Sequence, residues 1–249
     1  MSRPIYEAIG VGYGVVRQED PRVRHQLQAA LGGAVPVLNV GAGAGSYEPR
    51  DRAVLAVEPS LTMIRQRPDH AAPVVRAVAQ QLPFPDATFG AAMAVLTVHH
   101  WPDAAAGLAE VRRVTDGPVV VLTFDQTVHL AQWLVTDYFP EMAELDGELP
   151  TPAAIAAALG GGRVEVVSVP ADCLDGFCHA WWRRPQAYLS AAVRAGISGI
   201  ARQPVGVVDR AVAQLARDLD DGTWARAHAD LLDRDSIDAG YRLVISPGR

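Results

Sequence analysis

The segment Val37-Leu38-Asn39-Val40-Gly41-Ala42-Gly43-Ala44-Gly45 decides how the rest of this chain is interpreted. A mostly apolar run typical of a buried strand leads directly into glycines at alternate positions. Glycine has no Cβ, so its backbone N–H groups can come close to a bound ligand. A second apolar run, Leu55-Ala56-Val57, ends in Glu58, whose carboxylate can accept both hydrogen bonds from a ribose diol. The two strand ends together predict a pocket for a ligand that contains adenosine.

The glycine spacing disfavours a dinucleotide as that ligand. The pyrophosphate fingerprint has the spacing G-x-G-x-x-G and opens a full helix, whose positive N-terminal end faces the phosphates. This chain has G-x-G-x-G followed by Glu48 and Pro49, and a carboxylate there is expected to repel phosphate. Only residues 41–52 connect this strand to the next, so any intervening helix is short. A cofactor without phosphates is favoured.

Short apolar strands alternate with helical patterns through the middle of the chain. Strands are expected near residues 35–40, 53–58, 73–77, 88–95 and 118–124, and helices near 60–67 and 103–114. Ser60 and Asp103 are suitable N-caps for the two helices. This alternation predicts a doubly wound α/β fold.

The regions on either side of this core are expected to be more irregular. Val23, Leu27 and Leu31 recur at helical spacing and predict a leading helix, which Gly32-Gly33 ends. Beyond Phe124 the alternation stops, which suggests an inserted lid. Further elements are expected as helices near 152–159, 185–195 and 205–219 and as strands over 163–170 and 241–246.

These motifs resemble those of the class I S-adenosylmethionine-dependent methyltransferases over roughly residues 35–125. The glycine run is similar to that family's first motif, Glu58-Pro59-Ser60 to its ribose-binding strand end, and residues 79–84 to its adenine-side loop. Residues 92–103, 108–114 and 117–124 are similar to its fourth strand and exit, the following helix and the fifth strand. The sequence departs from the family at Val78 and Gly90, where acidic residues are frequent, and at Gln80, which replaces the usual Glu.

The resemblance implies a Rossmann-like seven-stranded sheet, mostly parallel, with an antiparallel final strand beside the fifth. It also implies S-adenosyl-L-methionine as cofactor and S-adenosyl-L-homocysteine as product. The expected cofactor-binding residues are Gly41, Ala42, Gly43, Gly45, Glu58, Pro59, Met63, Ala79, Gln80, Gln81, Leu82 and Leu96. We expect one domain over residues 1–249, with a helical cap (1–33), a cofactor-binding core (34–124) and acceptor-side lid insertions (125–150 and 171–235).

Methyl transfer from a sulfonium is an in-line displacement, so the protein mainly aligns the reactants and manages charge. An acceptor hydroxyl or ammonium must also lose a proton, and histidine titrates in a suitable range. His100 is the first candidate base and His99 the second, because both follow the fourth strand, where an acceptor should arrive. One ring could instead pack beneath the cofactor and the other cap the next helix.

Other residues are weaker candidates for the acceptor site. His129 and His179 could reach it, and Asp125 could orient a substrate or cap a turn. Aromatic residues in the insertions could line an apolar acceptor pocket or pack the lid onto the sheet: Trp133, Tyr138, Phe139, Trp181, Trp182 and Tyr188. Arg183-Arg184 could bind a substrate carboxylate or be a solvated helix entrance.

The composition of the chain limits the expected binding partners and cellular compartment. The net charge of −6 and the lack of any long basic run disfavour nucleic acid, so a small-molecule acceptor is expected. No apolar run is long enough to span a membrane and no signal-peptide core follows Met1, which favours the cytoplasm. Cys173 and Cys178, with His179 adjacent, match no common zinc spacing, so neither a metal nor a disulfide is expected. The oligomeric state stays open.

Two other functions remain open at this stage. One is a protein that binds S-adenosylmethionine without methylating, as a sensor, a partner-binding protein or a rearrangement catalyst. The other is a nicotinamide-dependent oxidoreductase, which the glycine spacing disfavours. The chain contains no lysine, so the Tyr-x-x-x-Lys pair of many reductases is also missing.

Overall fold

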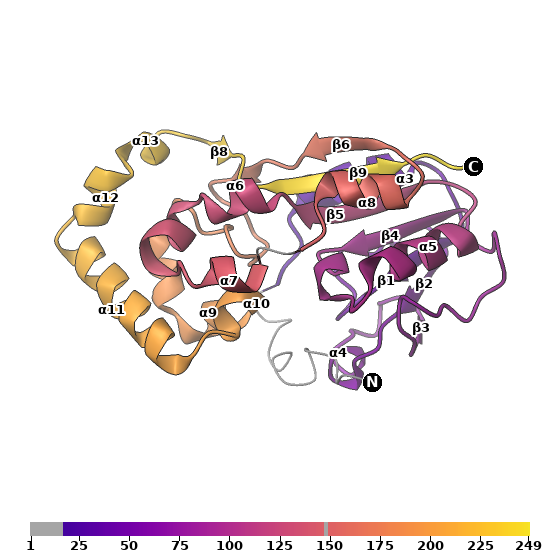
Figure 1. The fold of residues 1–249 in the computed structure, drawn as a ribbon, viewed down its shortest axis with the longest axis horizontal. Helices are drawn as coiled ribbons and strands as arrows, with labels where there is room; N and C mark the ends of the chain where they lie inside the picture. Colours follow the sequence, from indigo (N-terminus) through magenta and orange to yellow (C-terminus); the bar gives the residue numbers. More distant parts are fainter. Residues whose placement is uncertain (1–16, 147–148) are drawn as a thin grey trace.

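A seven-stranded sheet with the order β3-β2-β1-β4-β5-β9-β6 runs through the molecule (Figure 1). The structure is a computed structural model and describes residues 17–146 and 149–249. Residues 1–16 of the expected cap lie outside the described residues. The predicted seven-stranded, mostly parallel sheet is confirmed.

The parallel strands come from the middle of the chain, as the alternating pattern predicts. They are β1 (Val37–Val40), β2 (Val54–Val57), β3 (Val74–Val75), β4 (Ala91–Val95) and β5 (Val119–Phe124). Pairing of Val40 with Val57 sets the register of β1 on β2, so the glycine loop and Glu58 leave the sheet side by side. Parallel strands present their carboxyl ends at one edge of the sheet, which is where open α/β folds bind ligands.

The last strand, β9 (Tyr241–Ser246), lies antiparallel between β5 and β6 (Arg163–Val166). This insertion was expected, but a single strand over residues 163–170 is wrong. The chain leaves the sheet after Val167, whose N–H donates to the Tyr241 carbonyl at 2.9 Å, because β9 offers no further partner there. A separate short strand, β7 (Val169–Pro170), then pairs with β8 (Ser236–Ile237).

Helices cover both faces of the sheet and form two apolar cores. On one face, α3 (Pro21–Leu31) packs Val23, Leu27 and Leu31 against β4 and β5. On the other face lie α5 (Ala104–Val114) and α8 (Pro152–Ala158). The expected caps are confirmed: Ser60 accepts from Met63 N–H at the short helix α4 (Leu61–Ile64), and Asp103 accepts from Ala106 N–H at α5.

Apart from the 3-10 helix η1 (Val98–His100), which follows β4, the remaining helices form a group beside the sheet (Figure 1). They are α6 (Gln126–Leu130), the π-helical η2 (Leu134–Tyr138), α7 (Met142–Asp146), the 3-10 helix η3 (Pro185–Leu189), α9 (Ala191–Ala195), α10 (Ser198–Ala201), α11 (Val205–Asp220), α12 (Thr223–Ala227) and α13 (Ala229–Leu232). The helix expected over residues 185–195 is therefore broken, because Ser190 ends η3 and starts α9. Within the described residues, no helix has both the length and the apolar character that a bilayer crossing requires.

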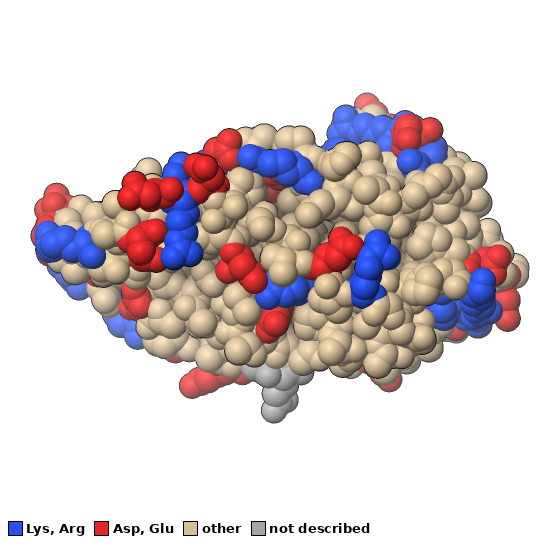
Figure 2. Space-filling view, turned by 90° about the horizontal axis from the view of Figure 1, so that it is seen from above, with Lys and Arg blue, Asp and Glu red and all other residues tan. Residues whose placement is uncertain are grey.

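Acidic and basic side chains alternate on the face seen in Figure 2. Arginines supply the basic groups, because the sequence has no lysine. Several of them pair with neighbouring carboxylates, as Arg210 does with Glu141 at 2.7 Å. On this face neither sign of charge is concentrated in one patch.

A buried ion pair closes the loop that follows β1. The carboxylate of Glu48 accepts two hydrogen bonds from Arg67, at 2.7 and 2.9 Å, and one from Asn39 at 3.1 Å. The Arg67 and Glu48 side chains are only 5% and 6% exposed. The expectation that Glu48 repels phosphate is therefore wrong, because Arg67 neutralises its charge inside the protein. The absence of any helix over residues 41–52 is the feature that distinguishes this loop from a dinucleotide fingerprint.

We expect Arg67→Met to lower the free energy of unfolding by about 3 kcal/mol or more, because it leaves a buried carboxylate without its cation. Urea titrations of the variant and the wild type measure the change. Arg163→Met is the matched control, since Arg163 pairs with Glu165 in solvent, and it should cost less than about 1 kcal/mol. Equal losses in the two variants would contradict the buried role of Arg67.

Candidate functional site

The glycine loop after β1 is shaped by contacts that exclude any side chain at Gly41. Gly41 has φ +69°, and a Cβ there would lie 2.1 Å from Thr97 Oγ1. Its N–H donates to the Val57 carbonyl at 2.8 Å, which ties the loop to the end of β2. Gly43 also has positive φ, and its backbone passes close to the Met63 side chain. The backbone of this loop is therefore open to close approach by a ligand, as the sequence predicts.

The Glu58 carboxylate connects the two neighbouring strand ends. Its Oε2 accepts from Gly43 N–H at 2.8 Å, and its Oε1 accepts from Ser60 N–H at 2.8 Å. The residue is 6% exposed, so this charge is held by backbone dipoles rather than by water. It stands at the tip of β2 with both oxygens oriented.

A cavity of about 310 Å³ lies at this edge of the sheet. That volume is at the lower end of the range for small-molecule sites. The predicted residues that line it are Gly41, Ala42, Gly43, Glu58, Pro59, Met63, Ala79, Gln80, Leu96 and His100. These residues come from the ends of β1, β2 and β4 and from the loop after β3, so one strand edge brings them together.

Three predicted cofactor residues do not line this cavity. Gly45 lies on the outer side of the loop, near Arg67 and Ala71. Leu82 is buried in the core, and its N–H donates to the Glu110 carboxylate at 3.0 Å. Gln81 points to solvent. The chain turns inward after Gln80, so only the first half of the expected adenine-side loop reaches the cavity.

Several lining residues were missed from the sequence. Asn39 lies on β1, and its Nδ2 donates to Glu48, while its buried Oδ1 has no hydrogen-bond partner among the described residues. An acceptor left over in this way suits a ligand with an ammonium or hydroxyl donor. Thr97 and Trp101 also line the cavity, and the Trp101 indole N–H donates to Thr97 Oγ1 at 3.3 Å. The tryptophan in the Trp-Pro-Asp sequence after the fourth strand was the signal available for that wall.

The departure at Gly90 also has a structural reason. A Cβ at this position would lie 2.5 Å from the carbonyl oxygen of Val35. An acidic side chain therefore cannot be accommodated just before β4 without moving the segment that contains Val35 and leads into β1. Gln80 occupies the position of the usual Glu, and its side-chain amide donates to the Asp103 carbonyl at 3.1 Å.

A second, smaller cavity of about 60 Å³ adjoins the first. The two share Arg17, Leu96 and His100 as lining residues. Leu96 follows β4 and has φ +49°, a conformation that costs energy for a residue with a side chain. The smaller cavity is otherwise lined by His99, Phe124, His129, Met142, Leu149, Phe177, Cys178, Gly196, Ile197, Ser198, Gly199, Arg202 and Tyr241. Core and lid residues thus meet beside the larger cavity.

Comparison with known proteins identifies the family. A family described as methyltransferase domain matches residues 38–121. A crystal structure from Anabaena variabilis, described as a candidate methyltransferase from an antibiotic biosynthesis pathway, is 30% identical in sequence. The match has a TM-score of 0.87 and covers 93% of this chain and 98% of that one. This chain belongs to the class I S-adenosylmethionine-dependent methyltransferases.

More distant structures share the fold. The cyclase SpnF is 16% identical, with a TM-score of 0.52 and coverage of 98% of this chain and 95% of that one. A chain from a Haloferax volcanii complex of the methyltransferase activator Trm112 with a candidate methyltransferase is 15% identical. Its TM-score is 0.51, with coverage of 100% and 99%. No curated protein matches the chain.

Family membership identifies S-adenosylmethionine as the cofactor of this methyltransferase. The nicotinamide alternative is therefore not supported. The larger cavity fits such a cofactor in three respects: a loop with no room for a side chain at Gly41, an oriented carboxylate at Glu58, and a buried Asn39 Oδ1 that has no hydrogen-bond partner within the described part of the chain.

The two predicted base candidates of the methyltransferase occupy different positions. The His99 and His100 rings lie 3.9 Å apart, and His99 also packs at 5.0 Å on the Phe124 ring. His100 lines both cavities, whereas His99 lines only the smaller one. Burial, followed by the nearby Arg202 charge, lowers the pKa of His100 to about 4. Burial and the His100 ring lower the pKa of His99 well below its usual range, so both rings are neutral at pH 7.

Of the weaker candidates for the acceptor site, only His129 lines either cavity. His129 lines the smaller cavity, while His179 lies behind it in hydrogen-bond contact with His129. Asp125 caps α6 by accepting from Thr127 N–H at 3.0 Å. Arg184 donates to the Cys173 carbonyl at 2.6 Å and Arg183 to carbonyls near α13, so neither lines a cavity.

The lid aromatics considered for the acceptor pocket line neither cavity. Trp133, Tyr138, Phe139 and Tyr188 are buried in a third apolar core between the lid helices, Trp181 packs against it, and Trp182 donates to the Val169 carbonyl at 3.1 Å. The aromatic lining instead comes from Phe124 at the end of β5, Tyr241 at the start of β9 and Phe177 in the loop after β7. Sequence position in an insertion was therefore a poor guide, because large aromatics are needed to pack the lid itself.

We expect His100 to make folding of this methyltransferase weaker in acid. An unfolded histidine takes up a proton near pH 6.5, whereas folded His100 does so only near pH 4. The unfolded state binds more protons between these values, so stability falls as the pH drops through this window. Urea titrations measure the free energy of unfolding at pH 7 and at pH 5. Between these two pH values the wild type should lose about 1 to 2 kcal/mol more of it than His100→Gln does. The exposed His25→Gln should match the wild type, and an unchanged pH dependence in His100→Gln would refute the depressed pKa.

Proposed function

We propose that this methyltransferase transfers the methyl group of S-adenosylmethionine in line to a small, mostly apolar acceptor held in the smaller cavity. The observation that carries this proposal is the contact between the two cavities at Leu96 and His100, which belong to the walls of both. When bound, S-adenosylmethionine supplies the electrophilic methyl carbon. With the cofactor in the larger cavity and the acceptor in the smaller one, the protein mainly has to align the methyl carbon with the acceptor atom.

We propose that the larger cavity holds the cofactor through backbone and carboxylate groups. The N–H groups of the glycine loop and the Glu58 carboxylate are already oriented by mutual hydrogen bonds, so little ordering is required on binding. Asn39 Oδ1 offers an acceptor for the ammonium of the cofactor's methionine part. Met63, buried beside Gly43, offers an apolar surface for the adenine ring.

We propose that the acceptor carries an anionic or strongly accepting group toward Arg202. This residue follows α10 and lines the smaller cavity. Within residues 17–146 and 149–249 its guanidinium has no hydrogen-bond or ion-pair partner, whereas Arg17 in the same wall pairs with Asp175 at 2.5 Å. The remaining wall is mostly apolar, which limits the acceptor to a compact ring or short chain.

In this scheme the lid, residues 125–150 and 171–235, supplies the acceptor side of the site. His129, Phe177 and Arg202 belong to it and all line the smaller cavity. His100 comes from the core and faces both compartments, so it is placed to accept a proton from the acceptor atom. Its ring is neutral at pH 7, which is the protonation state of a general base.

We expect Glu58→Gln to weaken binding of S-adenosylmethionine. The variant keeps the size of the side chain but loses charge-assisted hydrogen bonds, each worth about 1.5 to 3 kcal/mol, so Kd should rise by roughly 10- to 100-fold. Isothermal titration calorimetry measures this change. Glu110→Gln is the matched control because Glu110 lies on α5 outside the cavity. Unchanged affinity in Glu58→Gln would refute its assignment to the ribose.

We expect a panel of small phenols, amines and arylcarboxylates to reveal the acceptor when incubated with methyl-labelled S-adenosylmethionine. Loss of a general base commonly costs 100-fold or more, so His100→Gln should slow turnover by about 100-fold while leaving cofactor Kd within about threefold. Arg202→Gln should raise KM for the carboxylates more than for their uncharged analogues. Cofactor binding without label transfer to any acceptor would favour the non-methylating alternative.

A further inference from the structure

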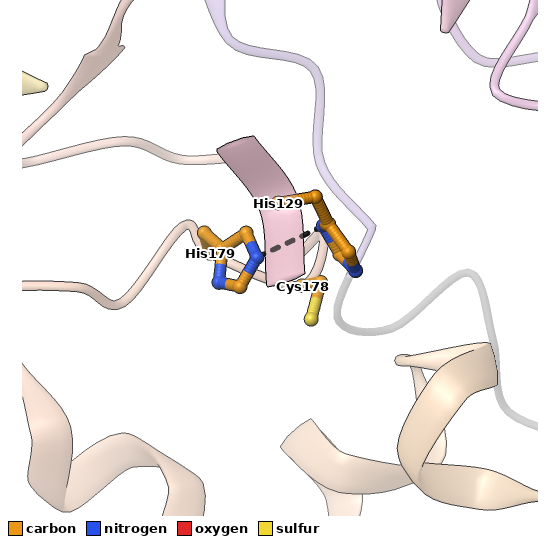
Figure 3. A group of neighbouring side chains, drawn as sticks. All are labelled: His129, Cys178 and His179. Carbon is orange, nitrogen blue, oxygen red and sulfur yellow. Dashed lines mark hydrogen bonds between the residues drawn. The ribbon is translucent and has the colours of Figure 1, made fainter. Parts of the chain in front are cut away.

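Three potential metal ligands meet beside the smaller cavity: His129, Cys178 and His179. Their ligand atoms all lie within 4.8 Å of one another. The two imidazoles face each other, with His179 Nε2 2.9 Å from His129 Nδ1 (Figure 3). His129 comes from α6 and the other two from the loop after Phe177, so the fold brings together residues far apart in sequence.

The ring of His129 and the backbone of Cys178 and His179 are held in place by their surroundings. His129 packs against Phe124, with ring centroids 4.7 Å apart. The Cys178 carbonyl accepts from the Tyr188 hydroxyl at 2.7 Å, and the adjacent His179 N–H contacts the Tyr241 hydroxyl at 3.5 Å. Fixed ligand positions reduce the ordering that a bound ion would demand.

The two imidazoles are buried, with His129 3% and His179 1% exposed. A hydrogen bond joins His179 Nε2 to His129 Nδ1, so one of these two nitrogens carries the shared proton. That proton must leave before both nitrogens can bind the same ion.

We propose that His129 Nδ1, His179 Nε2 and Cys178 Sγ form a zinc site that opens on the smaller cavity. Zinc binds imidazole at 2.0–2.1 Å and thiolate at about 2.3 Å, and three protein ligands with one open position are typical of its reactive sites. At a nitrogen separation of 2.9 Å, an ion at that bond length makes an angle of about 90°. Tetrahedral geometry requires the nitrogens to separate by about 0.5 Å and the two rings to turn until both lone pairs point at the ion in place of their hydrogen bond.

The open position of this site has a defined direction. His129 and Cys178 line the smaller cavity, whereas His179 lies behind them. The fourth ligand would therefore come from the cavity, as water or as the oxygen or sulfur atom of a bound molecule. Binding releases the Cys178 proton and the proton shared by the histidines to solvent.

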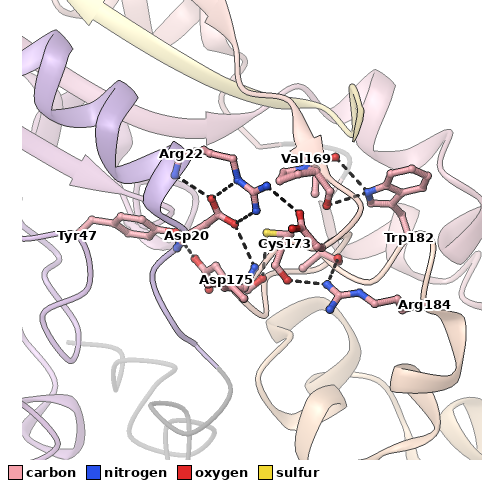
Figure 4. Close-up of polar contacts among 12 residues, drawn as sticks. Asp20, Arg22, Tyr47, Val169, Cys173, Asp175, Trp182 and Arg184 are labelled. Carbon is pink, nitrogen blue, oxygen red and sulfur yellow. Dashed lines mark hydrogen bonds and ion pairs between the residues drawn. The ribbon is translucent and has the colours of Figure 1, made fainter. Parts of the chain in front are cut away.

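The second cysteine is not part of the site and serves as the internal control. Cys173 belongs to a separate polar network with Asp20, Arg22, Tyr47 and Asp175 (Figure 4). Its thiol donates to the Asp175 carbonyl at 3.6 Å, and burial raises its pKa to about 12. Cys173 therefore remains a protonated thiol and does not bind the ion, whereas Cys178 does.

The test uses the full chain, stripped with a chelator and then dialysed against Zn²⁺. About one zinc per chain should remain, measured by mass spectrometry of the metal. Cys178→Ser and His179→Gln should lower zinc affinity by at least about 100-fold, and Cys173→Ser should leave it within about threefold. Substoichiometric zinc in the wild type, or equal retention in Cys178→Ser, would overturn the proposal.

Two readouts on the unmodified chain cover the case in which a variant does not fold. Co²⁺ should produce a thiolate-to-metal charge-transfer band and tetrahedral d–d bands, and a spectrum without the thiolate band would contradict the ligand set. Zn²⁺ should slow alkylation of Cys178 by iodoacetamide at least 10-fold, whereas equal rates with and without the metal would also reject the site. These readouts measure metal binding alone, so their outcome does not depend on whether the proposed methyl transfer is correct.

Discussion

The Glu58 carboxylate holds together the edge of the sheet on which the rest of the site depends. It accepts one backbone N–H from the loop after β1 and another from the start of α4, both at 2.8 Å. A buried carboxylate needs such partners, and a glycine loop without side chains needs an external constraint on its conformation. The loop therefore gives the carboxylate a hydrogen-bond donor, and the carboxylate fixes the conformation of the loop. Both line the larger cavity.

The smaller cavity depends on a different constraint, which is the burial of imidazole rings around Phe124. His99 and His129 pack on that ring at 5.0 and 4.7 Å, and His100 and His179 extend the row on either side. Removing imidazole from water favours its neutral form, which explains the low pKa values along the row. Neutral rings can accept a proton or bind a metal ion at pH 7.

A buried polar network joins the segment before α3 to the loop that carries Cys178 and His179 (Figure 4). The Tyr47 hydroxyl donates to Asp175 at 2.9 Å and accepts from Asp20 N–H at 3.1 Å. Arg17 also pairs with Asp175 and lines both cavities. The same carboxylate thus joins the start of the described chain to the loop that carries Cys178 and His179, so these two parts of the smaller cavity's wall are held together by one buried group.

The sequence by itself determined the alternation of strands and helices in the core, the caps at Ser60 and Asp103, and a pocket for an adenosine-containing ligand without phosphates. These follow from local chemistry: strand periodicity, side-chain capping, and glycines followed by a carboxylate at consecutive strand ends. The antiparallel last strand and the S-adenosylmethionine cofactor were implied by the family resemblance. Tertiary structure decided the rest. The burial of Glu48 against Arg67, the split after Val167, the packing of the lid tryptophans and the meeting of His129 with Cys178 and His179 all join segments distant in sequence. No local pattern encodes such contacts, because burial and pairing depend on which surfaces the whole chain brings together.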